Sequence, residues 1–322
     1  MAVNVSILAA MDRYRGPIFD EAVQIPVVGR ADAALRANDW ASLQAAFTEA
    51  TMQSRHSIVR RAGSMKGSED FYRGILQSNP RDLLAATVLA DRYVRMAWEA
   101  RGTGSYSTVS PQGYATFQGY LRTAEQILIG VCAQQPQFAP AWAVRLFTAT
   151  GLDLGAVEIL RRYQRLSSSS PHDLHAQFIT LQDLLPKWGG TWEMAHDFVW
   201  ECANAAPTGS PNAALVVMYY LERLISDDVS GVEEVLRDPQ VRHEIAAAAQ
   251  RSVKNPAFDA KADKVFALSL FALIFSLLED WPSAKDCFTR LGPYAVEAGW
   301  EYFGEDPSAV FNEARQEAMS KA

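Results

Sequence analysis

Cysteine is scarce in this chain, and its distribution excludes disulfide-stabilised and zinc-binding proteins. The 322 residues contain three cysteines, Cys132, Cys202 and Cys287, each among apolar residues with helical spacing. An odd number of widely separated cysteines does not form a disulfide framework, and no Cys-x-x-Cys pair is present to bind zinc or to carry out redox chemistry. We therefore expect small buried hydrophobic side chains in a reducing compartment, which favours a cytoplasmic location.

Excess positive charge and long hydrophobic runs are also missing. Thirty basic and thirty-seven acidic side chains give a net charge of −7. Since attraction to a phosphate backbone needs clustered positive charge, we expect no nucleic-acid partner. The most apolar uncharged run, residues 265–278, is shorter than the roughly 20 residues of a membrane-spanning helix, and residues 1–10 lack the basic start of a secretory signal. We expect a helix at 265–278 that is buried on nearly all sides, and no membrane association.

The chain lacks the motifs by which many enzymes and nucleotide-binding proteins are recognised. Gly189-Gly190 has neither the preceding strand nor the flanking glycines of a phosphate-binding loop, and no Gly-x-Ser-x-Gly sequence occurs. Asp227-Asp228 is a carboxylate pair of the kind that binds magnesium, but Val-Ser-Gly replaces the third acid that such a site needs. A capped turn is the better interpretation of that pair, and we expect no enzyme activity and no cofactor.

Three histidines would form a metal site only if the fold brought them together. His172 and His175 lie at the start of one predicted helix, and His196 lies in the next. Three imidazoles near one another suit a metal ion such as zinc. However, polar residues are ordinary at the start of a helix, and the spacing fixes no third ligand, so we expect no bound metal.

What the chain does contain, over almost its whole length, is the apolar periodicity of helices. The clearest example is a run from Leu174 to Leu185, after which Pro186 and the Gly189-Gly190 pair stop the helix and Thr191 restarts it as an N-cap. The pattern predicts two helices joined by a short turn, which is a helical hairpin.

A recurring spacing of apolar residues marks one face of the second helix of this hairpin. The apolar residues of this face are spaced three, four and three positions apart: Trp192, Ala195, Val199 and Cys202. The same steps begin at Trp40, Leu121 and Trp281. A large residue at the turn, followed by smaller residues where two helices touch, is typical of helical-repeat proteins. We therefore expect Trp192 to be a core residue.

Two copies of this spacing resemble the second helix of a tetratricopeptide repeat. They are Asn38–Ala50 and Trp281–Phe288, although the glycine and tyrosine usual in the first helix of each repeat are mostly missing. Pro186–Gly190 (PKWGG), with Ala97–Gly102 upstream, also resembles a bacterial family of uncharacterised tetratricopeptide-like proteins with no established activity. The resemblance implies a right-handed helical stack with a concave surface that binds a protein or peptide.

These observations predict an all-α fold, a tetratricopeptide-like α-solenoid of degenerate helical hairpins. Polar breaks such as Asn79–Asp82 separate the predicted helices, one of which covers residues 83–101. The polar segment Ser167–Pro171 is the best module boundary. It would separate N-terminal repeats over 1–166 from C-terminal repeats over 171–322, continuous as one solenoid.

Arginines and tryptophans are the candidate binding residues. Arg161 and Arg165 share a face of one predicted helix, and with Arg145 and Arg162 they could clamp a carboxylate or phosphate; the alternative is a solvated face paired with acids. Most of the eight tryptophans should serve hairpin packing. The tryptophans that could instead line a pocket are Trp98, Trp188 and Trp300.

Two functions fit this reading of the sequence. The first is a non-enzymatic scaffold or adaptor that binds a protein or peptide on its concave face and could also associate with itself. The second is a helical enzyme or small-molecule binder with a pocket between the hairpins of residues 140–207. Fold alone does not choose between them, because function depends on the site.

Overall fold

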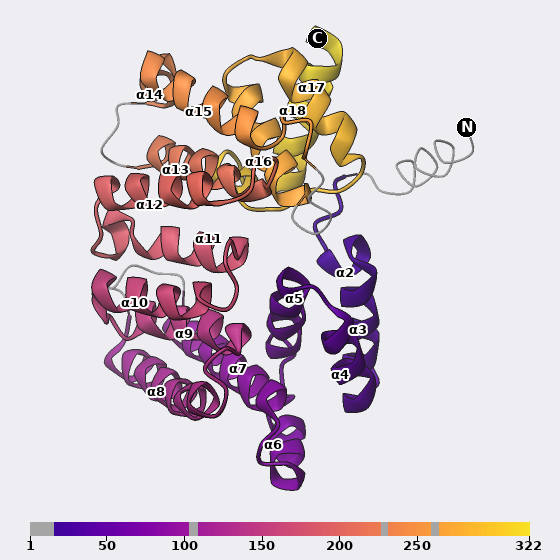
Figure 1. The fold of residues 1–322 in the computed structure, drawn as a ribbon, viewed down its shortest axis with the longest axis vertical. Coiled ribbons are helices and arrows are strands. Elements are labelled where there is room, and N and C mark those ends of the chain that lie inside the picture. The colour runs from indigo at the N-terminus through magenta and orange to yellow at the C-terminus, as the bar shows by residue number, and fades with distance from the viewer. Residues whose placement is uncertain (1–15, 103–108, 227–230, 259–263) are drawn as a thin grey trace, which may run out of the picture. The chain divides into compact units, whose positions relative to one another are not determined.

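Figure 1 shows a chain built from helices in the part that the structure describes. This computed structural model describes residues 16–102, 109–226, 231–258 and 264–322. Within those ranges the only β pairing is a single parallel bridge between Ile18 and Tyr294, and no helix has both the length and the apolar character needed to span a membrane. The all-α prediction is therefore confirmed, whereas Asp227-Asp228 and the first ten residues lie outside the described residues.

The internal contacts of the chain divide it into two compact units. The middle unit comprises Ile25–Met194, and the terminal unit comprises Ala195–Ala322 together with Met1–Gln24. The polar segment Ser167–Pro171, at which the sequence suggests a module boundary, lies inside the middle unit. A division of the chain at that segment therefore stays a prediction.

The middle unit consists of helices that pack mainly on their neighbours in the chain. The helices are α3 (Pro26–Arg36), α4 (Trp40–Glu49), α5 (Met52–Gly63), α6 (Glu69–Ser78), α7 (Leu83–Arg101), α8 (Pro111–Gln134), α9 (Ala139–Gly151), α10 (Gly155–Ser167), α11 (Leu174–Asp183) and the short 3-10 turn η2 (Pro186–Trp188). Consecutive helices between α6 and α11 pack on each other. In addition, α5 packs against α7, α9 and α11. Several begin after an Asp, Ser or Thr whose side chain accepts a backbone N–H of the first turn, as expected of N-caps: Asp39, Thr51, Asp82, Ser110 and Asp173.

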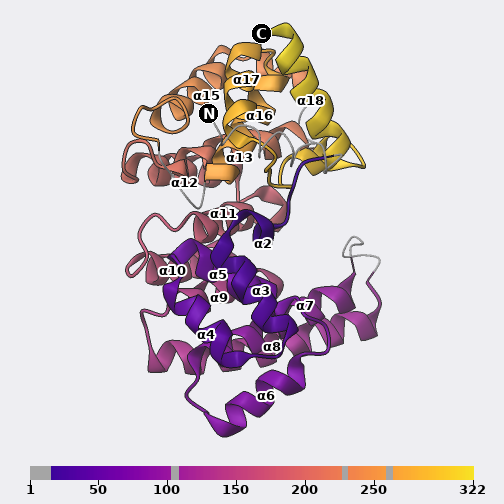
Figure 2. The same ribbon diagram turned by 90° about the vertical axis from the view of Figure 1, so that its right-hand side faces the viewer.

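The terminal unit is built around one buried helix. Its elements are α2 (Glu21–Gln24), most of α12 (Trp192–Ala205), η3 (Pro211–Ala213), α13 (Ala214–Leu224), α14 (Val232–Arg237), α15 (Pro239–Arg251), α16 (Lys264–Leu277), α17 (Trp281–Leu291), η4 (Trp300–Tyr302) and α18 (Pro307–Lys321). Figure 2 shows α16 between α13 and α17, both of which it contacts. Every residue from Ala267 to Ser276 is buried, which confirms the expected buried helix. The N-terminal segment joins this unit because Gln24 Nε2 donates to the carbonyl oxygens of Ile18 and Ala295, at 2.7 and 2.9 Å.

The recurring apolar spacing marks a buried helix face in all four copies. After the first position of each copy, no residue is more than 8% exposed: Leu43, Phe47, Ala50, Ala124, Leu128, Val131, Ala195, Val199, Cys202, Ala284, Phe288 and Leu291. The first position behaves differently in three copies, where Trp40, Trp192 and Trp281 are only half-buried, whereas Leu121 is fully buried. The expectation that Trp192 is a core residue is therefore wrong. As the first residue of α12, it lies at the rim of the packed face.

The turn after α11 stops one helix and starts another, as the sequence predicts. Gly189 adopts a left-handed conformation with φ of +87°, which favours glycine. Gly190 passes so close to Leu184 that a Cβ there would lie 2.0 Å from the Leu184 carbonyl oxygen. Thr191 Oγ1 then accepts the Met194 N–H at 3.1 Å and caps α12. Each glycine therefore has its own steric reason, and both directly follow Trp188 in the chain.

Candidate functional site

Two of the four candidate arginines are buried and bound inside the middle unit. Arg145 and Arg162 are 8% and 2% exposed, and their Nη2 atoms lie 2.6 and 2.9 Å from Oε1 of Glu125 on α8. Burial alone would raise the pKa of Glu125, but hydrogen bonds from Arg145 and Thr148 and the charge of Arg162 lower it. The prediction that Arg145 and Arg162 contact a partner is corrected here, because Glu125 occupies both guanidinium groups within the fold.

The other two arginines lie on the exposed side of α10. Arg161 and Arg162 both donate through Nε to Glu158, at 2.6 and 2.7 Å. The hydrogen bond from Arg161 is the main cause that holds the pKa of Glu158 at about 2, and Arg162 adds to it. Arg161 therefore belongs to a solvated face on which it pairs with an acid, which is the alternative interpretation from the sequence. Arg165 is exposed on the same helix.

The three histidines are not brought together. His175 is half-buried and lies against His56 of α5, with ring centroids 5.0 Å apart, and His56 Nε2 is 2.7 Å from Asp173 Oδ2. Burial, with the charges of His56 and Arg60, holds the pKa of His175 well below its ordinary value. Sequence reasoning missed His56, since it precedes Asp173 by 117 residues and no local pattern links them.

His196 has a different partner and belongs to the terminal unit. Glu244 on α15 accepts hydrogen bonds from His196, Trp200 and Tyr220 at 2.7–2.9 Å, and from Gln240 at 2.8 Å. Burial would raise the pKa of Glu244, but these hydrogen bonds outweigh it and hold the pKa at about 2. This Glu244 network ties α12 and α13 to α15. The described residues contain no group of three His, Cys, Asp or Glu side chains that could hold a metal ion.

Of the three candidate tryptophans, the structure brings two together. The rings of Trp98 and Trp188 meet edge to face with centroids 6.0 Å apart, and Trp98 packs against Phe117 at 5.0 Å. Trp188 remains 39% exposed. Trp300, in contrast, is fully buried in the core of the terminal unit, where its Nε1 donates to Ser269 Oγ at 2.9 Å. Only Trp98 and Trp188 therefore share a location.

A pocket of about 260 Å³ opens beside Trp188. It lies where the end of α9, the start of α10 and the turn after α11 meet. Its lining residues are Ala149, Thr150, Asp153, Gly155, Ile159, Lys187, Trp188 and Gly189. Apolar groups from Ala149, Ile159 and Trp188 are thus combined with one hydroxyl, one carboxylate and one ammonium group, a composition suited to binding an amphipathic group.

A buried carboxyl group lies directly behind this pocket. Thr150 Oγ1 donates to Asp183 Oδ1 at 2.6 Å, while Asp183 Oδ2 has no hydrogen-bond partner within the described residues. Asp183 is 3% exposed, and burial raises its pKa to about 7 against the opposing effect of the Thr150 hydrogen bond. Sequence reasoning missed this residue, because an Asp in the last turn of a helix looks like an ordinary surface residue.

Further exposed apolar side chains lie on α8 and at the start of α10. Leu154 and Val157 are 41% and 84% exposed and flank Gly155, which lines the pocket. Tyr114 of α8 is 38% exposed, and Gln118 connects it to the end of α9 by donating to both the Tyr114 hydroxyl and the Gly151 carbonyl oxygen. We call Tyr114, Leu154, Val157 and Trp188 the Trp188 surface.

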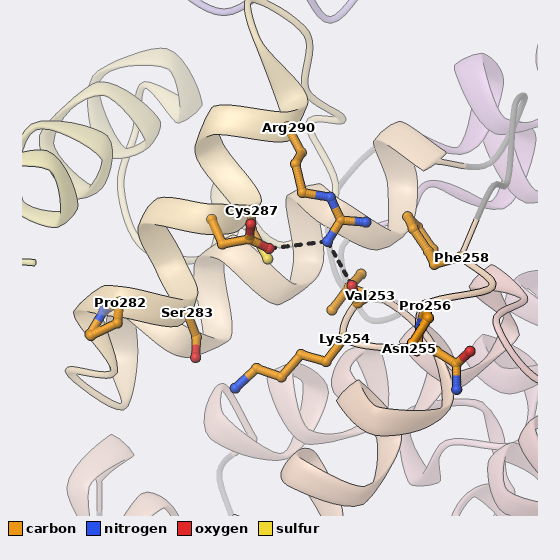
Figure 3. A pocket seen from close by; sticks show the side chains of 10 residues that line it. Val253, Lys254, Asn255, Pro256, Phe258, Pro282, Ser283, Cys287 and Arg290 are labelled. Carbon is orange, nitrogen blue, oxygen red and sulfur yellow. Dashed lines mark hydrogen bonds and ion pairs between the residues drawn. The ribbon is translucent and has the colours of Figure 1, made fainter.

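A second pocket, of about 580 Å³, lies in the terminal unit between α17 and the segment that follows α15 (Figure 3). Lys254, Phe258 and Arg290 line it, and Cys287 lies at its wall with a thiol whose pKa burial raises to about 12. A thiol with so high a pKa is neutral at physiological pH and is a poor nucleophile. The pocket therefore offers cations and apolar surface rather than a reactive group.

Comparison of the chain with protein-family models, with curated proteins and with solved structures finds no match.

Proposed function

We propose that this chain is a non-enzymatic adaptor that binds a protein or peptide through the Trp188 surface. The observation that carries the proposal is the exposure of Trp188: a turn with two sterically required glycines holds a tryptophan 39% exposed at the mouth of a pocket. Exposed tryptophans beside a pocket are the residues that most often dominate the binding energy of protein interfaces. Leu154 and Val157, at the start of α10, supply further exposed apolar side chains.

The size of the pocket favours a partner side chain over a whole small molecule. Sites for drug-sized ligands enclose about 300–1,000 Å³ and bury most of the ligand. The pocket beside Trp188 measures about 260 Å³, which is below that range. It has room for one anchoring side chain, with Thr150, Asp153 and Lys187 available to the polar atoms of that anchor.

The tetratricopeptide-like solenoid and the cytoplasmic location are parts of this proposal. The buried faces at the four copies of the apolar spacing support the first. Three free cysteines, all buried, support the second, because thiols persist in a reducing compartment.

A site-specific cross-linking experiment tests the proposal. A photoreactive p-benzoylphenylalanine is placed at Val157, and in a matched variant at Ile129 of α8, which is 49% exposed but lies outside the Trp188 surface. After irradiation in an extract of the source organism, we expect one defined adduct at position 157 and none at 129. The Trp188→Ala substitution should abolish the adduct at 157.

The captured protein is then purified and its affinity measured by calorimetry. We expect Trp188→Ala to weaken binding at least roughly tenfold, as for an interface hot spot, and Ile129→Ala to leave it within about threefold. No adduct at position 157, or equal affinity of the purified protein for Trp188→Ala and for the unsubstituted chain, would refute the proposal.

A further inference from the structure

The second pocket presents two cationic side chains with unused hydrogen-bonding capacity. Arg290 uses one nitrogen: Nη1 donates to the Val253 carbonyl oxygen at 2.6 Å and to Asp286 at 3.1 Å. Within the described residues its Nε and Nη2 atoms have no hydrogen-bond partner. These two atoms form one edge of the guanidinium group, and this two-donor edge matches the two oxygens of a carboxylate.

Lys254 supplies the second cation. Its Nζ is 3.7 Å from Asp280 Oδ2, beyond hydrogen-bond distance, and 4.8 Å from the centre of the Phe275 ring. In the described part of the chain this ammonium group makes no hydrogen bond, and the side chain is 37% exposed. Figure 3 shows Lys254 reaching toward Ser283, and the Arg290 guanidinium group beside Phe258 with a dashed line to Val253.

Apolar surface accompanies these charges. The Phe258 ring lies under the Arg290 guanidinium group, with its centre 5.0 Å from Cζ, so that the ring and the cation stabilise each other. Pro256 and Pro282 add flat apolar faces to the lining. With about 580 Å³, the pocket falls within the range typical of small-molecule sites.

We propose that this pocket binds a small organic carboxylate. Lys254, Arg290 and Asp286 give the lining a charge of +1, and Asp280, 3.7 Å from Lys254, offsets part of it, so a singly charged carboxylate suits the site better than a doubly charged phosphate. The ligand carboxylate bonds to the free edge of Arg290 and pairs with Lys254, while its apolar part lies against Phe258 and the prolines. The site is independent of the Trp188 surface, which belongs to the middle unit.

Benzoate is the probe for this proposal, and benzamide is its neutral control of the same shape. Binding to the full chain is followed by NMR through the Nε–H signal of Arg290, identified by its loss in Arg290→Lys. We expect saturable binding of benzoate, at least about tenfold tighter than that of benzamide. Lys254→Gln should weaken benzoate binding several-fold, with no change in the melting temperature that would indicate misfolding.

A substitution that should tighten binding separates this proposal from general loss of structure. Asp286→Asn removes a negative charge that repels a carboxylate bound at Arg290, so we expect benzoate to bind several-fold tighter. Asp70→Asn in the middle unit, where Asp70 pairs with Arg73, changes the net charge equally and should have no effect. Equal binding of benzoate and benzamide, equal effects of the two substitutions, or tighter binding of phenyl phosphate than of benzoate would overturn the proposal.

Discussion

Asp183 links the stability of the middle unit to pH. An isolated Asp carboxyl has a pKa near 3.9, whereas burial raises the pKa of Asp183 in the folded chain to about 7. The folded state therefore holds a proton that the unfolded state has released between about pH 4 and pH 7. Where the unfolded chain binds fewer protons, stability falls as pH rises, so the contribution of Asp183 is complete below about pH 4 and is lost by about pH 7.

The Asp183→Asn substitution should remove this pH dependence. The amide imitates the neutral acid, and its oxygen still accepts the Thr150 hydroxyl. At pH 4.5 the variant and the unsubstituted chain should differ little in their free energy of unfolding. At pH 8 the variant should be more stable by roughly 3 to 4 kcal/mol, at about 1.4 kcal/mol per pKa unit. Urea denaturation across this pH range measures the difference.

Asp153→Asn is the matched control for Asp183→Asn. Asp153 lines the same pocket but is exposed, so the variant should keep the pH profile of the unsubstituted chain. If Asp183→Asn left the profile between pH 5 and 8 unaltered, the carboxyl group of Asp183 would have to be hydrated, and its assignment as a buried neutral acid would be wrong.

Among the elements, the interface of α8, α9 and α10 depends on Glu125. The Glu125 side chain is 12% exposed and binds two arginines whose side chains are 9% and 3% exposed. Removing one partner of a buried ion pair leaves the other charges uncompensated, which typically costs about 3 to 5 kcal/mol. We expect Glu125→Gln to lower the free energy of unfolding by about 3 kcal/mol or more in urea denaturation.

An exposed ion pair provides the comparison for Glu125→Gln. Arg30 and Glu49 pair with side chains 57% and 63% exposed. Solvent screens such a pair, so Glu49→Gln should change the free energy of unfolding by less than about 1 kcal/mol. Similar losses in the two variants would show that Glu125 is hydrated and that the buried network does not hold the three helices together.

The turn between α11 and α12 distinguishes two kinds of glycine requirement. Gly189 needs a positive φ, but a Cβ there would meet nothing within 4 Å, so Gly189→Ala should cost about 1 to 2 kcal/mol. At Gly190 a Cβ would overlap backbone atoms of Leu184, which cannot turn away as a side chain can. Gly190→Ala should therefore destabilise the chain more than Gly189→Ala, as measured by the melting temperatures; the reverse order would refute this account of the turn.

Local signals in the sequence predict the elements well and their long-range partners poorly. The helix predicted over residues 83–101 has those bounds in the structure. Its start and end signals, the N-cap Asp82 and the terminating Gly102, are residues adjacent to the helix and can be read from the sequence. In contrast, nothing in the residues around Arg145 and Arg162 distinguishes them from arginines on a solvated helix face. They are buried because the fold brings Glu125 of another helix, α8, against them. The pairing of His56 with Asp173 and the burial of Asp183 depend in the same way on tertiary packing.

At the scale of the whole molecule, periodicity predicts which faces are buried but not how the chain divides. The four copies of the apolar spacing recur along the chain, so the sequence suggests one continuous array of hairpins. The structure instead groups the N-terminal segment with Ala195–Ala322 through Gln24, whose side chain joins Ile18 to Ala295. Contacts between residues 271 positions apart leave no periodic signal, so this grouping could not be predicted.

The three buried cysteines report on the opening of each unit separately. Cys132 lies in the middle unit, and Cys202 and Cys287 lie in the terminal unit. Burial raises the pKa of both Cys132 and Cys287, so labelling by a thiol reagent at pH 8 requires local opening. We expect Glu125→Gln to accelerate labelling of Cys132, which lies on the same helix as Glu125, and to leave Cys202 and Cys287 unchanged. Mass spectrometry of the labelled peptides measures the three labelling rates. Equal acceleration at all three cysteines would contradict this expectation, because opening of the terminal unit would then depend on the Glu125 network as well.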